Sequence, residues 1–139
     1  MRTATPTSED LMAVADLATL FEASDFSPGK WHMPETREDG VIEMGWWEAH
    51  SAVAVWEQAL YDHNIIDADS GYLAEDNVVL VKATIKEPAL VAGFDLTTLR
   101  RVLTFLARAE RHADGGWFEE AFLTGMAQAA TRRLGELGR

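Results

Sequence analysis

Three side chains with acid–base chemistry fall at helical spacing in the middle of the sequence. His50 and Glu57 are seven residues apart and Tyr61 follows one turn later, inside a stretch with helical periodicity. A histidine beside a carboxylate and a phenol can carry out proton transfer. The same residue types also occupy any solvated helix face, and we favour that second interpretation. The sequence therefore predicts no catalytic residue and keeps His50, Glu57 and Tyr61 as an alternative site.

A second candidate is a stripe of basic and aromatic side chains in the last third of the chain. Arg101, Phe105, Arg108 and His112 recur on one face of an expected helix, and Arg111 lies beside them. Fixed guanidinium groups can clamp a carboxylate or a phosphate. Alternatively, these arginines pair with the acidic N-terminal part of the same chain or of a second copy. We favour this alternative, because it explains the charge distribution without a ligand.

Metal and cofactor sites find little support in the sequence. The chain has four histidines and no cysteine, and it lacks His-x-x-x-His and Glu-x-x-His pairs at matching helical positions. Asp67 and Asp69 begin like a calcium loop, but Tyr72 stands where that loop needs glycine and Val78 where it needs glutamate. No glycine-rich phosphate loop or Gly-x-Ser-x-Gly motif occurs. We expect no metal and no cofactor.

The tryptophans point to binding. The chain has five of them, and Trp31, Trp46 and Trp47 lie close together in the sequence. Successive side chains of an extended strand point to opposite faces, so Trp46 and Trp47 cannot both face the interior. One indole is expected in the core, and the other is either exposed for a partner or covered by another part of the chain. Trp46 and Trp47, with Arg108 and Arg111, form the predicted binding site.

The charge of the chain excludes several function classes. Twelve basic and 23 acidic side chains give a net charge of −11. This balance argues against direct binding of nucleic acid or of an anionic membrane, because both need clustered basic residues. Residues 1–94 hold five basic and 17 acidic side chains, a net of −12, whereas residues 95–139 hold seven and six, a net of +1. The acidic surface is therefore expected on the first two thirds of the chain.

The elements that would position these residues are helices and one hairpin. Thr7 and Asp95 are good helix caps, and Gly125 is expected to break or kink a helix. Trp31–Met33 and Val41–Trp46 are expected to pair as strands across a polar turn. Residues 88–93 fit one helical turn, and residues 72–85 stay open between strand, helix and irregular structure. The expected helices cover about residues 7–23, 48–64, 95–113 and 117–137.

These elements predict an α+β fold that is mainly α. We expect four or five helices around one core with a short β-hairpin packed against them, because a two-stranded ribbon is marginal alone. The length fits a single domain over residues 1–139, with residues 1–7 as a flexible N-terminus. The opening residues lack the apolar core of a secretory signal, and no apolar run reaches the length of a membrane span. A cytoplasmic location is therefore expected.

Several segments also resemble a known family. They are Phe26–Trp31, Gly40–Met44, Ala59–His63, Gly116, Ala121–Gly125 and above all residues 95–111, DLTTLRRVLTFLARAER. Over about residues 10–137 the chain resembles a bacterial family of small acidic proteins, found largely in actinobacteria and their phages and catalogued only as a domain of unknown function. The resemblance implies a shared mixed fold and no activity. Arg108 and Arg111 match the family pattern, but no role transfers to them.

The sequence leaves two kinds of function open. The first is a non-catalytic interaction module that binds a protein partner or itself through the Trp46 and Trp47 region and the acidic surface. One version of it is an acidic inhibitor that mimics nucleic acid, with carboxylates from residues 35–76 at phosphate-like spacing. The second is a small-molecule site or enzyme between the hairpin and the 95–113 helix, which would use Arg108, His50 and Glu57.

Overall fold

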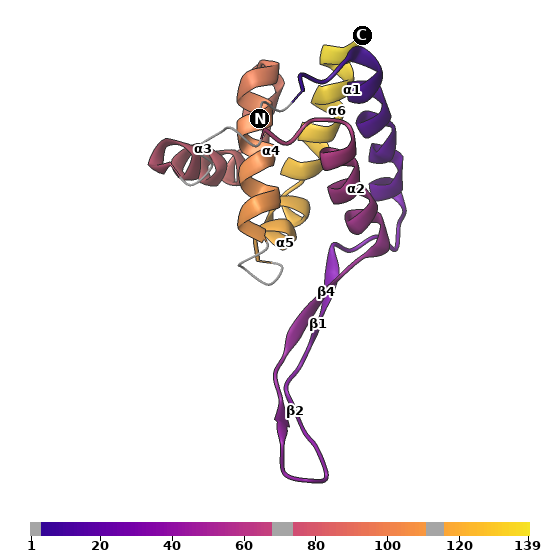
Figure 1. The fold of residues 1–139 in the computed structure, drawn as a ribbon, viewed down its shortest axis with the longest axis vertical. Coiled ribbons are helices and arrows are strands. Elements are labelled where there is room, and N and C mark those ends of the chain that lie inside the picture. Colours follow the sequence, from indigo (N-terminus) through magenta and orange to yellow (C-terminus); the bar gives the residue numbers. More distant parts are fainter. Residues whose placement is uncertain (1–3, 68–73, 111–115) are drawn as a thin grey trace.

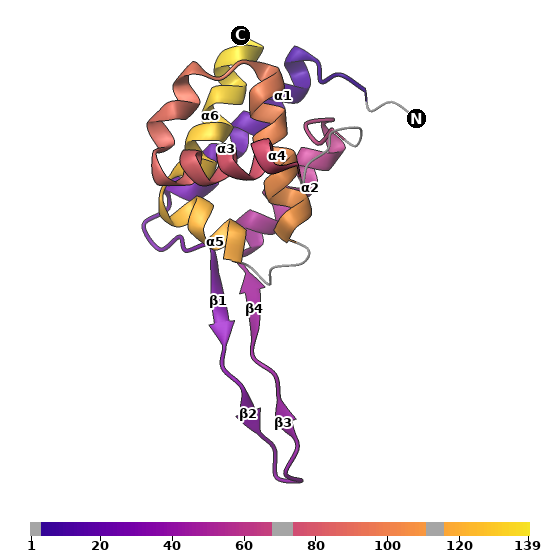
Figure 2. The same ribbon diagram turned by 90° about the vertical axis from the view of Figure 1, so that its left-hand side faces the viewer.

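The computed structural model describes residues 4–67, 74–110 and 116–139. It has two parts, a helical body and a long β-hairpin that projects from one end of it (Figures 1 and 2). We call the hairpin, residues 29–49, the arm. In both views, helices α4 and α6 run roughly along the long axis of the molecule and α3 lies across them. The helices are α1 (Ser8–Ala15), α2 (Ser51–Asp62), α3 (Glu75–Lys86), α4 (Leu96–Glu110), α5 (Gly116–Leu123) and α6 (Met126–Gly138), with 3-10 helices η1 (Asp16–Glu22) and η2 (Pro88–Gly93).

The helix boundaries follow from caps that the sequence displays. The Thr7 hydroxyl accepts a hydrogen bond from the Asp10 backbone N–H, and the Asp10 carboxylate accepts one from the Thr7 N–H, which completes a capping box at α1. Asp95 accepts a hydrogen bond from the Thr98 N–H at 2.8 Å and begins α4. Gly125 adopts φ +88° between α5 and α6, a left-handed conformation that favours glycine. The expected caps and the break at Gly125 are confirmed.

The core lies where α2, α5 and α6 meet. Trp56 of α2 is fully buried, and Phe118 and Phe122 of α5 pack edge-on against its indole. The indole N–H donates to the Thr131 hydroxyl of α6 at 2.9 Å, so the buried polar atom is satisfied. Leu99 and Leu103 of α4 are also fully buried and belong to the same cluster. The expectation of one core is confirmed for the described residues.

The arm is built from two short antiparallel ladders. Strand β1 (Gly29–His32) pairs with β4 (Trp46–Ala49), and β2 (Glu35–Thr36) pairs with β3 (Ile42–Glu43) farther out. A turn closes the tip, where the Gly40 N–H donates to the Arg37 carbonyl and Gly40 adopts φ +83°. The arm contacts the body only at its base, where Trp47 packs against the core, and its outer half extends away (Figure 2).

The predicted fold class, mainly α with a β-hairpin, is confirmed. Packing of the hairpin on the helices is confirmed only at its base, because Ile42 and Met44 stay 65% and 83% exposed. The predicted 48–64 helix begins later, since residues 48 and 49 belong to β4. The single-domain assignment stays a prediction. Within the described residues, no helix has both the length and the apolar character needed to cross a bilayer.

Of residues 72–85, which the sequence left open, residues 75–85 belong to helix α3, and residues 72 and 73 lie outside the described residues. The β-branched run Val78–Val81 suggested a strand, but Val81 and Ile85 are buried at a helical spacing of four. Val79, two residues before Val81, is 62% exposed, as the outer face of an amphipathic helix requires. Packing against α4 therefore overrides the local strand propensity.

Candidate interaction surface

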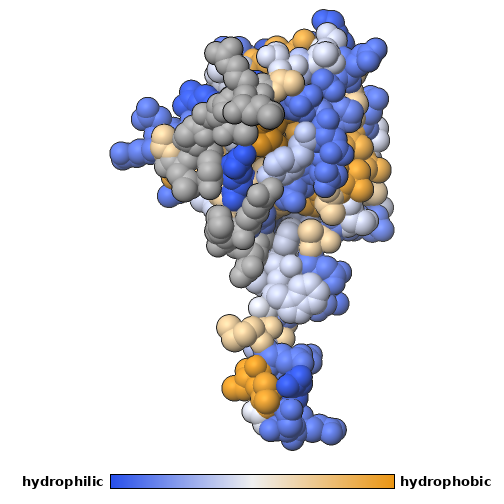
Figure 3. All heavy atoms as spheres, in the orientation of Figure 1, coloured by the Kyte–Doolittle hydropathy of each residue, from blue (hydrophilic) through white to orange (hydrophobic). Residues whose placement is uncertain are grey.

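The arm carries a concentration of exposed apolar side chains. Figure 3 shows apolar residues on the arm beyond its base, next to hydrophilic ones. Met44 is 83% exposed and Ile42 is 65% exposed, in a segment where alternation predicted a half-buried strand. The strand period is present, but no part of the described body covers its apolar side. The exposed large apolar side chains of the arm are Trp31, Met33, Val41, Ile42, Met44 and Trp46.

Trp46 and Trp47 point to opposite faces of the arm, as strand geometry requires. Trp47 is half-buried against the core, and a methyl group placed on Gly29 would overlap its indole. Trp46 is 51% exposed and stacks on the His32 ring, with 4.1 Å between ring centroids and 9° between planes. The stacked His32 in turn lies 3.2 Å from a carboxylate oxygen of Glu48. The exposed indole is therefore held in one orientation.

The acidic residues of the arm are interleaved with basic ones. The arm holds five acidic and two basic side chains, and all five acids are exposed. Arg37 lies 3.5 Å from Asp39 and 3.6 Å from Glu43, so part of the negative charge near the tip is compensated. The strand register places Trp46 opposite His32 and Glu35 opposite Glu43, so His32 and Glu43 are not cross-strand partners.

A groove lies at the base of the arm, along α5. Its first hollow, about 380 Å³, is lined by Trp31 of β1 and by Gly116, Trp117, Glu119 and Glu120. The Trp31 indole N–H donates to a Glu119 carboxylate oxygen at 2.6 Å, which ties the arm to α5. The second hollow, about 370 Å³, shares two of these residues and is lined by Lys82, Ile85, Lys86, Trp117, Glu120 and Thr124. We call the two hollows together the α5 groove.

The arginines of α4 bind carbonyl and amide oxygens. Arg100 donates to the carbonyls of Ile65 and Asn64 at 3.1 and 3.2 Å, and Arg101 donates to the Asn77 side-chain oxygen at 2.8 Å. Arg100 and Arg101 therefore fasten the segment after α2 and helix α3 to α4, and neither forms an ion pair with an acidic side chain of the described chain. Pairing of the arginine stripe with a second copy stays a prediction. Arg108 is half-buried on α4, and Arg111 lies outside the described residues.

His50, Glu57 and Tyr61 lie on or beside α2. The Nδ1 atom of His50 accepts a hydrogen bond from the Ala52 N–H at 3.0 Å, which makes His50 the N-cap of the helix. Its ring packs edge-on against Phe26. Glu57 and Tyr61 are half-buried, and neither hollow of the α5 groove is lined by any of the three. Proton-transfer chemistry by these residues stays a prediction.

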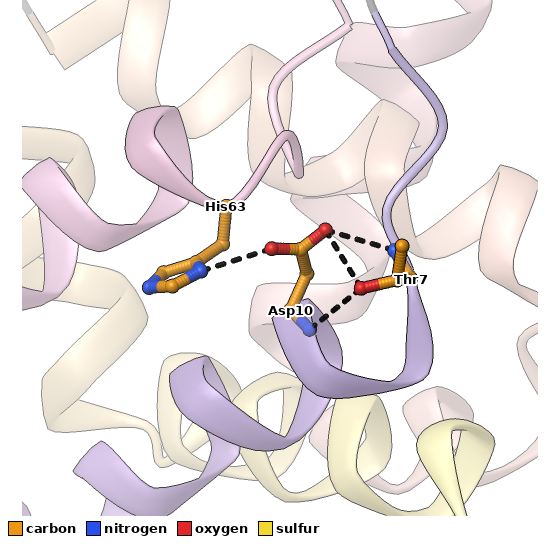
Figure 4. Close-up of polar contacts among 3 residues, drawn as sticks. All are labelled: Thr7, Asp10 and His63. Carbon is orange, nitrogen blue, oxygen red and sulfur yellow. Dashed lines mark hydrogen bonds and ion pairs between the residues drawn. The ribbon is translucent and has the colours of Figure 1, made fainter.

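His63 joins the first two helices through a carboxylate. Its Nδ1 atom lies 3.1 Å from Asp10, the same side chain that closes the capping box with Thr7 (Figure 4). The hydrogen bond from the Thr7 backbone N–H, helped by His63, lowers the pKa of Asp10 below its ordinary value. Asp10 is 53 residues away in the sequence, and nothing local indicates the pair.

A buried carboxylate that sequence reasoning missed orders the start of α5. Glu110, only 9% exposed, accepts hydrogen bonds from the Trp117 and Phe118 backbone N–H groups, both at 3.1 Å. Negative charge is favourable at the positive end of a helix. The sequence offers a weak signal for this cap, a glutamate at the end of one apolar stripe and two glycines before the next. Glu110 therefore fixes the backbone that carries Trp117 into the groove.

Comparison with known proteins gives one match. A family of unknown function, DUF6508, matches residues 6–139, which is nearly the whole chain. The chain belongs to this family. No curated protein and no solved structure matches it. The resemblance to a family catalogued only as a domain of unknown function is thereby confirmed, and the DUF6508 membership assigns no activity to any residue of the site.

Proposed function

We propose that this DUF6508 chain is a non-catalytic interaction module that binds a cytoplasmic protein through its arm. The observation that carries the proposal is a projecting hairpin that exposes six large apolar side chains together, whereas the five exposed on the described helical body are scattered, one each on η1, α2, α3, η2 and α5. Exposed large apolar groups on a soluble chain mark surfaces that other molecules cover. Trp46 and Met44 are the central groups of this surface, at 51% and 83% exposure.

The shape and charge of the arm indicate what kind of partner fits. A two-stranded ribbon offers unpaired backbone groups along its edges, and a partner strand can add to such an edge. The arm carries five acidic and two basic side chains, so the partner is expected to present an apolar patch with a basic rim. Stacking of Trp46 on His32 fixes the indole before binding, which lowers the entropy lost on association.

Other versions of the function receive less support. For a nucleic-acid mimic, the acidic side chains should repeat without compensation, but Arg37 lies between Asp39 and Glu43. For an enzyme between the arm and α4, His50, Glu57 and Arg108 would need to converge on one hollow, but none of them lines either hollow of the α5 groove. Self-association through the same apolar surface remains the alternative partner choice. The experiment below separates it from binding of a different protein.

The test compares an arm variant with a matched variant of the body. Ile42→Ser combined with Met44→Ser removes apolar surface from the arm, and Val79→Ser combined with Leu123→Ser removes similarly exposed surface from α3 and α5. Cross-linking in host cells, followed by mass spectrometry, identifies proteins bound to each tagged chain. We expect one partner bound by the wild type and by the body variant, and bound about tenfold less by the arm variant.

Two outcomes would contradict or redirect the proposal. If the arm variant, with an unchanged thermal unfolding curve, retains every partner of the wild type, the arm is not the binding surface. Sedimentation velocity of the purified chain over a concentration series provides the second check. Self-association that only the arm variant abolishes would identify the partner as a second copy of this chain.

A further inference from the structure

The α5 groove has two indoles fixed in place at its first hollow. Trp31 is 48% exposed, and its N–H is bound to Glu119 at 2.6 Å. Trp117 is half-buried and stands edge-on to Phe105, with 4.8 Å between centroids and an angle of 87°. Its backbone N–H is bound by Glu110. Because both rings are held by contacts within the chain, the hollow exists before any ligand arrives.

The charges around the groove are divided between its two ends. Glu119 and Glu120 line the first hollow beside the two indoles, and Lys82 and Lys86 line the second. The lysines are four residues apart on α3, and therefore share one helix face. Across the described residues, neither lysine nor Glu120 forms an ion pair. The first hollow is thus lined by two carboxylates, and the second by two lysines and the shared Glu120, so the net charge of the lining changes from negative to positive along the groove.

Indoles next to carboxylates are the surroundings that a cation prefers. A guanidinium or ammonium group over the face of tryptophan is attracted by the ring quadrupole, and the adjacent carboxylates add Coulomb attraction. Arginine also stacks its planar group on an aromatic ring, which suits a hollow with two indoles. The second hollow, with Ile85 and two lysines, suits an apolar side chain followed by a carboxylate.

We propose that the α5 groove binds a basic side chain of a protein partner between Trp31 and Trp117, with an acidic residue of the same segment at Lys82 and Lys86. The inference rests on the proposed function, because it supplies the chemistry of the partner at the base of the arm. The partner segment carries an arginine or lysine followed within a few residues by a carboxylate. Glu120 lines both hollows. It therefore faces the part of the partner segment that lies between the basic residue and the acidic residue.

The test uses a peptide probe and the intact chain. The probe is acetyl-Ala-Arg-Ala-Glu-Ala-amide, titrated into nitrogen-15-labelled protein while the indole N–H signals are followed by NMR. We expect saturable shifts of the Trp31 and Trp117 signals and none at buried Trp56. Replacing the probe arginine by glutamine should weaken binding about two- to fivefold, the range that an exposed cation–π contact contributes. Tetramethylammonium is titrated as a comparison for a small free cation.

Protein variants separate local binding from general attraction to an acidic chain. Glu120→Gln removes one charge inside the groove, and Glu22→Gln removes one exposed charge on η1. We expect Glu120→Gln to weaken the probe about threefold and Glu22→Gln to leave it unchanged. Lys82→Gln should weaken binding of the probe. It should not weaken binding of a second probe in which glutamine replaces the glutamate. Equal effects of Glu120→Gln and Glu22→Gln would overturn the proposal.

Two further results would also overturn it. The first is an absence of Trp31 and Trp117 shifts up to the highest probe concentration. The second is binding of tetramethylammonium without any binding of the peptide. The outcome is distinguishable from that of the arm experiment, because the NMR titration contains no partner protein and the arm variant leaves the groove residues in place. If the probe does not bind the groove but the arm variant loses the partner, the partner is bound by the arm alone.

Discussion

Trp56 and Trp46 are ten residues apart in the sequence and lie in parts of the molecule that use an indole in opposite ways. Trp56 is fully buried in the body, with its N–H bound to Thr131 and phenylalanines against its ring. Trp46 is 51% exposed on the arm and contacts the His32 ring. The first contributes to folding through burial, whereas the second leaves its apolar surface available for association.

We infer from this difference that the order of the arm depends on the body, whereas the folding of the body does not depend on the outer arm. A two-stranded ribbon without a covering layer is marginal in water, so the arm takes its order from Trp47 and Trp31 at its base. The body has its own core of fully buried side chains on α2, α4 and α6. Four predictions test this division, in order of decreasing effect.

The largest effect is expected from the buried indole. Trp56→Ala opens a cavity and leaves Thr131 without its indole partner, so the free energy of unfolding should fall by about 3–5 kcal/mol. Trp46→Ala on the arm should change it by less than about 0.5 kcal/mol. Urea unfolding followed by far-UV circular dichroism measures both. A loss of similar size in the two variants would show that the arm belongs to the cooperative core.

The next largest effect on the free energy of unfolding is expected at a buried carboxylate, Glu110, compared with an exposed one, Glu120. Glu110→Gln weakens the bonds to the Trp117 and Phe118 N–H groups, and we expect it to lower the free energy of unfolding by about 1–3 kcal/mol. Glu120→Gln, an exposed change on α5, should cost less than about 0.5 kcal/mol. Thermal unfolding of the two variants, side by side, makes the measurement.

A smaller effect is expected at the contact between α1 and α2, and it depends on pH. The pKa of Asp10 is lowered in the folded chain, so its ionised form stabilises the fold above the ordinary carboxyl pKa of 3.8. That stabilisation is lost as the pH falls through the lowered folded pKa. Asp10→Asn should therefore be less stable than the wild type near neutral pH, and the gap should shrink in acid. Melting curves across pH, with Glu9→Gln as control, test this. A gap that is independent of pH would contradict it.

The smallest effect on stability is expected from removing the outer arm. The strands β1 and β4 end opposite each other at His32 and Trp46, so residues 33–45 can be replaced by Asn-Gly. The free energy of unfolding should change by less than about 1 kcal/mol, because the deleted residues are largely exposed. Binding of the partner should be lost. Unfolding of the helical body in this variant would contradict the inference that the body folds without the outer arm.

The parts of the fold that have local signals were predictable from the sequence. Thr7 and Asp95 cap the helices that they were expected to cap, and Gly125 separates two helices with a positive φ. Alternation at residues 42, 44 and 46 indicated an apolar side of a strand. Alternation cannot say whether the chain itself covers that side, and here the strand runs beyond the body. This is why the expected packing of the outer hairpin was wrong.

The candidate site was less predictable, because its contacts join distant parts of the chain. Trp31 and Glu119 are 88 residues apart, and Trp117 and Lys82 meet at the groove only because α3 lies across α4 and next to α5. Strand propensity at Val78–Val81 also concealed the helix that carries Lys82 and Lys86. The sequence identified Trp46 and Trp47 as a pair with one face each, since that follows from backbone geometry alone.

The hydrogen bond from Trp31 to Glu119 has a mechanical consequence. Trp31 lies at the base of the long, narrow arm, and Glu119 lies on α5, the helix next to that base. A force applied at the tip is delivered to the base of the arm, where this hydrogen bond and the packing of Trp47 are the described attachments to the body. Rotation of the arm away from α5 would separate the Trp31 indole from the Glu119 carboxylate and widen the first hollow of the α5 groove.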